Sequence, residues 1–335
     1  SINMAMQPFK MMVGDMVNEK QKGLAYSIQS FLCNAGSLVG FLFPFIFTWI
    51  GISNIAPQGV VPDSVIYSFY IGAAILILCV IYTTVKVKEM PPAEYAEYHG
   101  ITEEEKKEKI NMVKLLVKAP KAFWTVVLVQ FFCWFAFMFM WTYTNGSVAA
   151  NVFDAPTVET VVNGANKVVL DTKSIQYQNA ADWVGVLFAV QAIGSVLWAV
   201  CIPMFKNRKL IYSLSLILGG IGFISTYFVH NQYVLFISFL LIGCAWAAML
   251  ALPFTILTNA LSGGHMGTYL GLFNGTICIP QIVAATLGGS ILALFTPKGM
   301  LPPEINMLVM AGVMLIIGAV CVYLIKETKG EQAKT

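Results

Sequence analysis

Charged residues are scarce in this sequence: only 11% of its 335 residues are Asp, Glu, Lys or Arg, whereas 58% are hydrophobic. A soluble domain has about 25% charged residues, which cover its core with polar surface. The composition therefore excludes a water-soluble globule of this length and indicates a membrane protein. The sequence also lacks a cleavable signal peptide and begins at Ser1 rather than Met, so we expect a fragment of a longer chain.

Residues that bind metals or nucleic acids are few or badly spaced. The seven cysteines stand singly inside apolar runs and are interpreted as small core residues. His99, His230 and His265 fall in predicted loops, which argues against a buried proton relay and against a membrane-embedded enzyme. No Lys and Arg patch is interleaved with aromatic residues. We therefore predict no catalytic residues, no metal site, no cofactor other than a coupling ion, and no nucleic-acid partner.

Long apolar runs, by contrast, are abundant. A run of about 20 residues can cross the roughly 30 Å hydrocarbon core of a bilayer as a helix. The predicted full spans are residues 24–50, 66–85, 121–143, 183–204, 210–229, 234–257, 268–295 and 305–325, and residues 1–16 resemble the last half of another span. The predicted fold class is therefore an all-α, polytopic membrane protein with about eight full spans and one partial span.

The stretch Lys86–Lys121 holds 15 of the 37 charged residues and separates the first spans from the last six. Lys and Arg near span ends accumulate on the cytoplasmic side of a membrane. If this stretch is cytoplasmic, 17 Lys and Arg residues lie on its side and three lie on the other. We therefore predict a multi-pass protein of the cell (inner) membrane with a cytoplasmic C-terminus.

Two loops carry signals of local structure. Thr102 and Glu105 form a capping box that precedes apolar residues at helical spacing, Ile110, Val113 and Val117. This pattern predicts a short amphipathic helix on the membrane surface, with a solvated charged linker as the alternative. On the other side of the membrane, residues 158–162 and 167–170 flank a turn at 163–166 and predict a β-hairpin.

Glycine repeats predict close packing of helices, since small residues let backbones approach. They are Gly36 with Gly40, and Gly267 with Gly271 and Gly275. Transporters built of two helical bundles divide equally around a long central loop, so about three and a half spans are expected to be missing before residue 1. The expected organisation is an incomplete N-terminal bundle (1–87), a cytoplasmic central loop (88–120), a six-helix C-terminal bundle (121–326) and a cytoplasmic tail (327–335).

Polar side chains inside a span are costly, and five spans place them on one face, which indicates a polar cavity. Amides bond sugar hydroxyls in pairs and indole rings cover the apolar face of a pyranose, whereas an ion or phosphate site would need more charge. The predicted substrate-binding residues are Asn34, Gln130, Trp134, Trp141, Gln191, Asn274 and Gln281. For each one alone, the alternative is an amide that bonds between helices or an indole of the interfacial belt.

Asp15 is the only carboxylate in or beside the apolar runs that a coupling mechanism could readily use. Because Lys20 and Lys22 follow it closely, a salt bridge explains the same residue equally well. The remaining candidates, Asp182 and Glu327, sit at span ends and are interpreted as interfacial charges.

Residues 8–15, PFKMMVGD, and residues 272–282, LFNGTICIPQI, form two motifs. These motifs resemble those of the sucrose:proton symporters and their bacterial relatives, in the glycoside-pentoside-hexuronide:cation symporter branch of the major facilitator superfamily. The segment Pro8-Phe9-Lys10-Met11-Met12-Val13-Gly14-Asp15 resembles the Pro-x-Arg-x-Leu-x-x-Asp pattern of that family's fourth helix, with Lys10 and Met12 as substitutions. The segment 272–282, LFNGTICIPQI, resembles the asparagine-to-IPQ stretch of its eleventh helix, and Pro253-Phe254 also fits. A family arginine associated with sugar binding falls near Gly23 here, beside Lys22.

The resemblance implies a major facilitator-type two-bundle fold, alternating access and proton coupling at Asp15. The expected function is proton-coupled symport of a disaccharide or small glucoside, similar to maltose or sucrose, with sodium coupling left open. The expected partners are a small-molecule sugar and the lipid bilayer, and we expect a monomer. The alternatives are an exporter of drugs or metabolites with the same fold, which would favour an apolar cavity, and a non-transporting sugar sensor.

Overall fold

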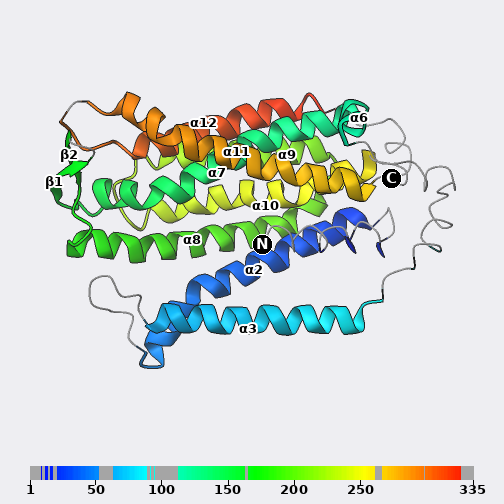
Figure 1. Cartoon of the computed structure of the whole chain (residues 1–335), viewed down its shortest axis with the longest axis horizontal. Helices are drawn as coiled ribbons and strands as arrows, with labels where there is room; N and C mark the ends of the chain where they lie inside the picture. The colour runs from blue at the N-terminus through cyan, green and yellow to red at the C-terminus, as the bar shows by residue number, and fades with distance from the viewer. Residues whose placement is uncertain are drawn as a thin grey trace.

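The computed structural model describes residues 21–52, 63–88, 112–162, 165–260, 266–297 and 299–325, with a few isolated residues elsewhere. Long helices lie side by side, and a small hairpin lies at one end of them (Figure 1). The long helices are α2 (Lys22–Trp49), α3 (Asp63–Lys86), α7 (Lys121–Asn151), α8 (Ile175–Cys201), α9 (Arg208–Ser225), α10 (Leu235–Ala260), α11 (Met266–Phe295) and α12 (Ile305–Val322). The short ones are α6 (Met112–Val117) and the 3-10 helix η1 (Ile202–Met204).

The predicted class, an all-α polytopic membrane protein, is confirmed. In the described part of the chain, seven helices are long and apolar enough to cross a membrane. The helix α2, with 28 residues, covers the remaining predicted full span. Most of the predicted partial span at residues 1–16 lies outside the described residues.

Two helices extend beyond their predicted spans at the end that carries the hairpin. The helix α7 continues to Asn151 rather than residue 143, and α8 begins at Ile175 rather than residue 183. Ser174 starts α8 as an N-cap, because its side chain accepts a hydrogen bond from the Tyr177 backbone N–H at 3.2 Å. Hydropathy marks only the apolar part of a helix, so it misses turns that extend into the polar region.

The predicted hairpin is confirmed. Strands β1 (Thr157–Val162) and β2 (Ala165–Leu170) pair antiparallel, with Val162 opposite Ala165. Ala165 and Asn166, which were predicted in the turn, belong to β2 instead, where they pair with Val162 and Val161.

The charged central stretch contains a described helix at its C-terminal end, α6. The hydroxyl of Tyr269 on α11 donates a hydrogen bond to the Leu115 carbonyl at 3.2 Å and joins α6 to the bundle. Of the residues that predicted an amphipathic helix, Val113 and Val117 lie in α6, whereas Thr102, Glu105 and Ile110 lie outside the described residues.

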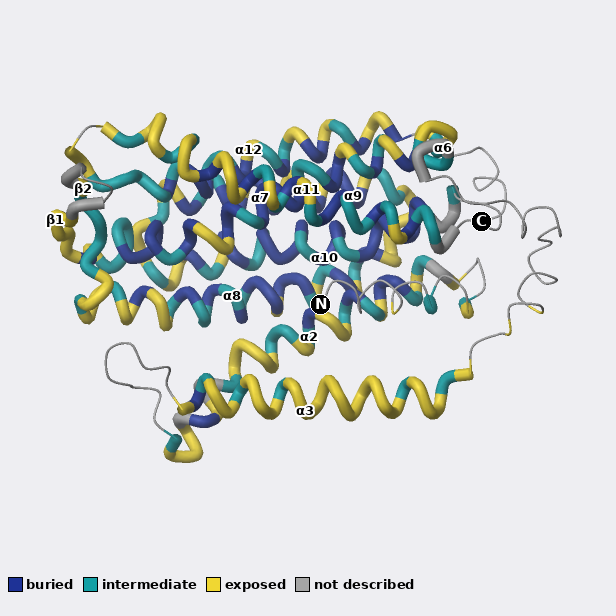
Figure 2. The backbone as a smooth tube through the Cα atoms, in the orientation of Figure 1, coloured by how far each residue is buried: buried dark blue, intermediate teal, exposed yellow. Residues whose placement is uncertain are grey.

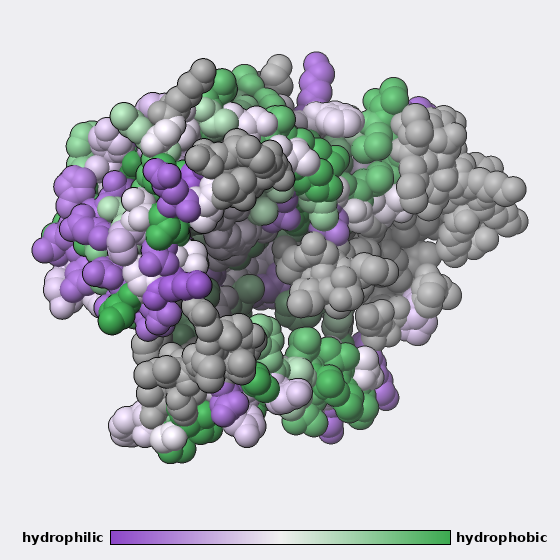
Figure 3. Space-filling model, turned by 60° about the vertical axis from the view of Figure 1, so that its left-hand side comes forward, coloured by the Kyte–Doolittle hydropathy of each residue, from purple (hydrophilic) through white to green (hydrophobic). Residues whose placement is uncertain are grey.

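The helices α7 to α12 form one packed body, with α7 against α12 and α11, and α10 against α8 and α9. The helix α2 crosses this body against α8 and α10, and α3 packs on α2 (Figure 1). Buried residues concentrate in the body, while α3 is exposed along nearly its whole length (Figure 2). Hydrophilic residues gather at the hairpin end, as Figure 3 shows. Lipid or further helices must cover the apolar surface of α3.

Four of the five glycines in the predicted repeats do not mark close contacts between helices among the described residues, contrary to the prediction, and the surroundings of Gly267 are not described. A Cβ atom on Gly36, Gly40, Gly271 or Gly275 would meet no described atom within 4 Å. Helix backbones instead approach at Gly194 and Gly243, between α8 and α10, and at Gly220 and Gly312, between α9 and α12. A spacing of four residues places glycines on one face but does not say which face meets a neighbour.

Candidate functional site

One turn of α10, from Gly243 to Ala247, is the place where predicted site residues from different helices converge. The helices α2, α7 and α8 each contact this turn or a residue inside it. We refer to the turn as the α10 crossing. Because α2 belongs to the part of the chain before the charged stretch, the α10 crossing joins the two halves of the sequence.

Three tryptophans form a cluster on the α7 side of the α10 crossing. Trp134 and Trp141 lie two turns apart on one face of α7, and Trp246 reaches between them from α10. The ring centroid of Trp246 lies 5.8 Å from that of Trp134 and 5.7 Å from that of Trp141. Phe137, on the same face of α7, lies 4.8 Å from Trp246. These edge and tilted contacts are typical of stable aromatic packing.

Trp134 carries a hydrogen-bond donor that this packing leaves unused. The side chain is 7% exposed, and its indole N–H has no hydrogen-bond partner among the described residues. A buried donor without an acceptor costs about 1–3 kcal/mol, so such a group requires a partner such as a water molecule or a ligand. Trp141, at 43% exposed, presents an open ring surface beside it.

The helix α2 brings Asn34 to the other side of the α10 crossing. Its side-chain N–H donates to the Ser30 carbonyl at 2.7 Å, and the Ser30 hydroxyl contacts the Ala247 carbonyl at 3.5 Å. Asn34 is 1% exposed, and its side-chain oxygen lacks a partner among the described residues. The Nε2 atom of Gln29 is also buried and also lacks a hydrogen-bond partner among the described residues. This part of α2 therefore offers both an acceptor and a donor.

Gln191 lies where α8 meets the α10 crossing. Gly243 has no side chain, which lets α10 approach the backbone of α8 at Gln191 and Ser195. Gln191 is 6% exposed, and the Ser195 hydroxyl is fully buried without a partner among the described residues. Of the predicted residues, Trp134 and Trp141 contact the α10 crossing through their rings, Gln191 meets it through its backbone, and Asn34 is joined to it through Ser30.

The other predicted residues lie elsewhere. Gln130 points into the bundle and donates to the Tyr212 hydroxyl at 3.0 Å and to the Met249 carbonyl at 3.2 Å. Asn274 and Gln281 are partly buried on α11, which packs against α7. Asp15 lies outside the described residues. The roles predicted for these four residues stay predictions.

Sequence reasoning missed Trp246, although a signal was present. Interfacial tryptophans lie near the ends of a span, whereas Trp246 lies near the middle of α10. A tryptophan at that depth needs aromatic neighbours or a ligand, and Trp134 has the same midspan position in α7.

The α10 crossing is uncharged. The residues named around it include no Asp, Glu, Lys or Arg, and the described part of the chain holds no group of three or more His, Cys, Asp or Glu suited to a metal ion. The arrangement combines aromatic rings with buried, unpaired amide, hydroxyl and indole groups. It is therefore suited to a neutral ligand with both hydroxyl groups and an apolar face.

The fold and this uncharged site between helices are those of a polytopic membrane transporter. The sequence matches the Major Facilitator Superfamily over residues 3–165 and over residues 148–335. The chain therefore belongs to the Major Facilitator Superfamily. No curated protein sequence matches it.

Among solved structures, the fold is similar to a variant of the E. coli fucose:proton symporter FucP, with a TM-score of 0.59 and 15% sequence identity. The match covers 95% of this chain and 72% of that one. It is also similar to a Major Facilitator Superfamily transporter, FucP, in the outward conformation, with a TM-score of 0.63 and 13% identity. That match covers 95% of this chain and 71% of the other. Identities this low establish a shared fold only.

Proposed function

We propose that the protein is a sugar:cation symporter of the glycoside-pentoside-hexuronide type, which carries a disaccharide or small glucoside together with a proton. The observation that carries this proposal is the buried indole N–H of Trp134, unpaired inside a cluster of three tryptophans. A pyranose supplies a hydroxyl to accept from such a donor and a C–H face to lie on the rings. One solved protein that shares this fold is a fucose:proton symporter, and this example motivates the choice of a sugar as the substrate to test.

The α10 crossing suits alternating access because it joins α2 to the α7–α12 body. In the proposed cycle, Trp134, Trp141 and Trp246 hold the sugar ring on the α7 side of the α10 crossing, and Asn34 on α2 and Gln191 on α8 are candidates for further contacts. Release of the sugar frees α2 to move relative to α10. Asp15 carries the coupling proton, and the protein works as a monomer with its C-terminus in the cytoplasm. Asn274, Gln281 and Gln130 remain candidates for further sugar contacts.

The site is tested by Trp134→Phe, which keeps an aromatic ring but removes the N–H. Trp198→Phe is a matched control, since the Trp198 N–H donates to the Ser215 hydroxyl at 2.8 Å, a bond within the bundle. Loss of one hydrogen bond of about 0.5–1.5 kcal/mol weakens sugar binding by about 2- to 10-fold. Binding of maltose, sucrose and fucose to the purified variants is the measurement. Equal affinity in Trp134→Phe and the wild type would remove Trp134 from the site.

A further inference from the structure

A carboxyl group lies between α7 and α12 at the hairpin end, far along the helices from the charged central stretch. Glu304 immediately precedes α12, and its side chain does not cap that helix. The carboxyl instead lies against Gly146 on α7, where a Cβ atom would overlap it. The absence of a side chain at Gly146 thus makes the room that Glu304 occupies.

Few titratable groups face this carboxyl. The helix α7 contributes Tyr143, which interacts electrostatically with Glu304 and whose hydroxyl lies against Gly288 on α11. The chain after α9 carries Tyr227, which is 48% exposed, and His230, whose Nδ1 lies 3.3 Å from the Asn151 carbonyl on α7. At this end the described part of α11 contributes no titratable group. Lys298, on the segment before Glu304, lies outside the described residues.

Burial without a described cationic partner favours the neutral form of Glu304. It raises the pKa of the carboxyl from 4.5 to about 7. The N-terminus of α12 would favour a negative charge, but only for a carboxylate that reaches its free N–H groups. Glu304 makes no such bond, since its side chain is turned toward α7.

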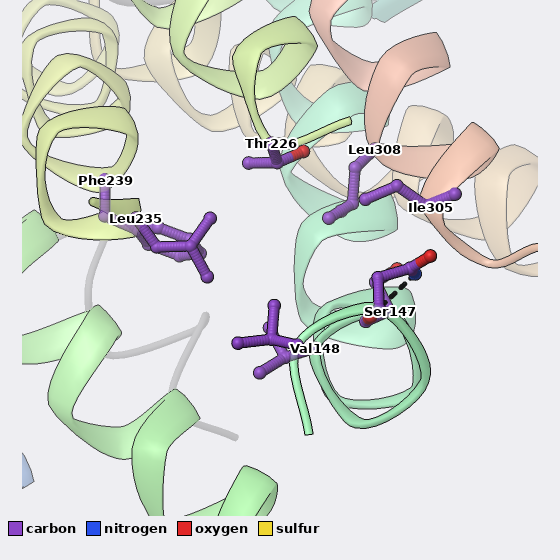
Figure 4. A pocket seen from close by; sticks show the side chains of 9 residues that line it. Ser147, Val148, Thr226, Leu235, Phe239, Ile305 and Leu308 are labelled. Carbon is purple, nitrogen blue, oxygen red and sulfur yellow. Dashed lines mark hydrogen bonds between the residues drawn. The ribbon is translucent and has the colours of Figure 1, made fainter. Parts of the chain in front are cut away.

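A small cavity adjoins the contact between Glu304 and Gly146. Its volume is about 10 Å³, close to the space that one water molecule needs. Ser147 and Ile305, the chain neighbours of Gly146 and Glu304, line it together with Leu308 and Thr226 (Figure 4). The Ser147 hydroxyl is 1% exposed and has no partner among the described residues. A buried hydroxyl without a described partner therefore lies one residue along the chain from the glycine that the carboxyl contacts.

We propose that Glu304 is a proton-binding site of the α7–α12 contact, separate from Asp15 and from the α10 crossing. The carboxyl holds its proton while it lies against Gly146. When α7 and α12 part at the hairpin end, water reaches the group, the carboxyl O–H bond breaks, and the proton passes to the aqueous phase. With the predicted topology this is the outer side of the membrane, where a symporter takes up its proton, so the role of this site in transport rests on the proposed function.

The experiment is an infrared titration of the protein in lipid vesicles, which follows the C=O band of protonated carboxyl groups between pH 5 and 9. Glu304→Gln removes the site, and Glu159→Gln on the exposed strand β1 is a matched control at the same end of the molecule. The wild type and Glu159→Gln are expected to show a component from Glu304 with a midpoint near pH 7, in addition to any signal from Asp15 and Asp182. Glu304→Gln is expected to lack this component. An unchanged titration in Glu304→Gln overturns the proposal.

Two further results separate this inference from the proposed function. If Glu304→Gln folds poorly, Glu304→Asp shortens the reach to Gly146, and its midpoint is expected to fall; a midpoint equal to that of the wild type overturns the proposal. Sugar uptake is measured in the same vesicles. Titration at Glu304 without proton-driven uptake in the wild type supports the proton site and refutes the symporter. Proton-driven uptake with no titration at Glu304 supports the symporter and refutes the proton site.

Discussion

The side-chain amide of Gln130 donates to the hydroxyl of Tyr212 at 3.0 Å, and both residues are almost completely buried. The same amide nitrogen donates to the Met249 carbonyl at 3.2 Å, so one side chain joins α7, α9 and α10. In a membrane protein, such bonds hold helices together where apolar packing against lipid-like neighbours gives little preference. An amide on a predicted polar stripe can thus serve the bundle itself.

Gln130→Leu is therefore expected to destabilise the protein, because the buried Tyr212 hydroxyl loses its donor. The expected cost is about 1–3 kcal/mol, measured as a lower thermal unfolding midpoint of the purified protein. Gln281→Leu, on the partly buried face of α11, is the control. Adding Tyr212→Phe to Gln130→Leu removes both partners and is expected to restore part of the loss. A change in sugar affinity with unaltered stability would assign Gln130 to the substrate instead.

Gly243→Ala is expected to disrupt the α10 crossing, since its Cβ would collide with the backbone of α8 at Gln191. The backbone cannot rotate away as a side chain can, so the folded yield and thermal stability should fall. Gly36→Ala is the control: nothing described lies within 4 Å, and alanine favours a helix by about 1 kcal/mol over glycine. Equal stability of the two variants would contradict the contact.

The sequence predicted the membrane class and the helices well, because apolar runs report directly on burial in lipid. It also placed Asn34, Trp134, Trp141 and Gln191 on polar faces; the structure brings the rings of Trp134 and Trp141 to Trp246, whereas Gln191 meets α10 through its backbone and Asn34 only through Ser30. Helical spacing, however, says which residues share a face, not what that face meets. This is why Gln130 turned out to contact Tyr212, and why the predicted glycine repeats miss the contacts.

Helical spacing and hydropathy could not identify two residues, Trp246 and Glu304. Trp246 is apolar enough to pass as core, and its position matters only because α7 brings Trp134 and Trp141 to it. Glu304 stands in a loop sequence after two prolines, where an acidic residue is ordinary. Its burial depends on Gly146, which is more than 150 positions earlier in the chain. Neither contact produces a recognisable pattern among neighbouring residues in the sequence.

The raised pKa of Glu304 predicts that stability depends on pH. The folded state favours the neutral form of this carboxyl. The stability that Glu304 contributes is therefore fully present below pH 4.5 and is lost as the pH rises through about 7. At about 1.4 kcal/mol per pKa unit, the loss is at most about 3 kcal/mol. The thermal unfolding midpoint of the wild type should therefore fall between pH 5 and 8, whereas that of Glu304→Gln should fall less. Parallel curves for the two proteins would contradict the burial of an ionisable carboxyl.

The central claim, proton-coupled sugar symport, is tested most directly by uptake of labelled maltose, sucrose and fucose into vesicles that carry the full-length protein. Uptake is measured with a proton gradient, with a sodium gradient and with neither. We predict accumulation driven by the proton gradient, which Asp15→Asn abolishes while leaving some sugar exchange. Wild-type accumulation in Asp15→Asn would remove that residue from coupling. Folded protein that takes up none of the three sugars under any gradient would contradict the account.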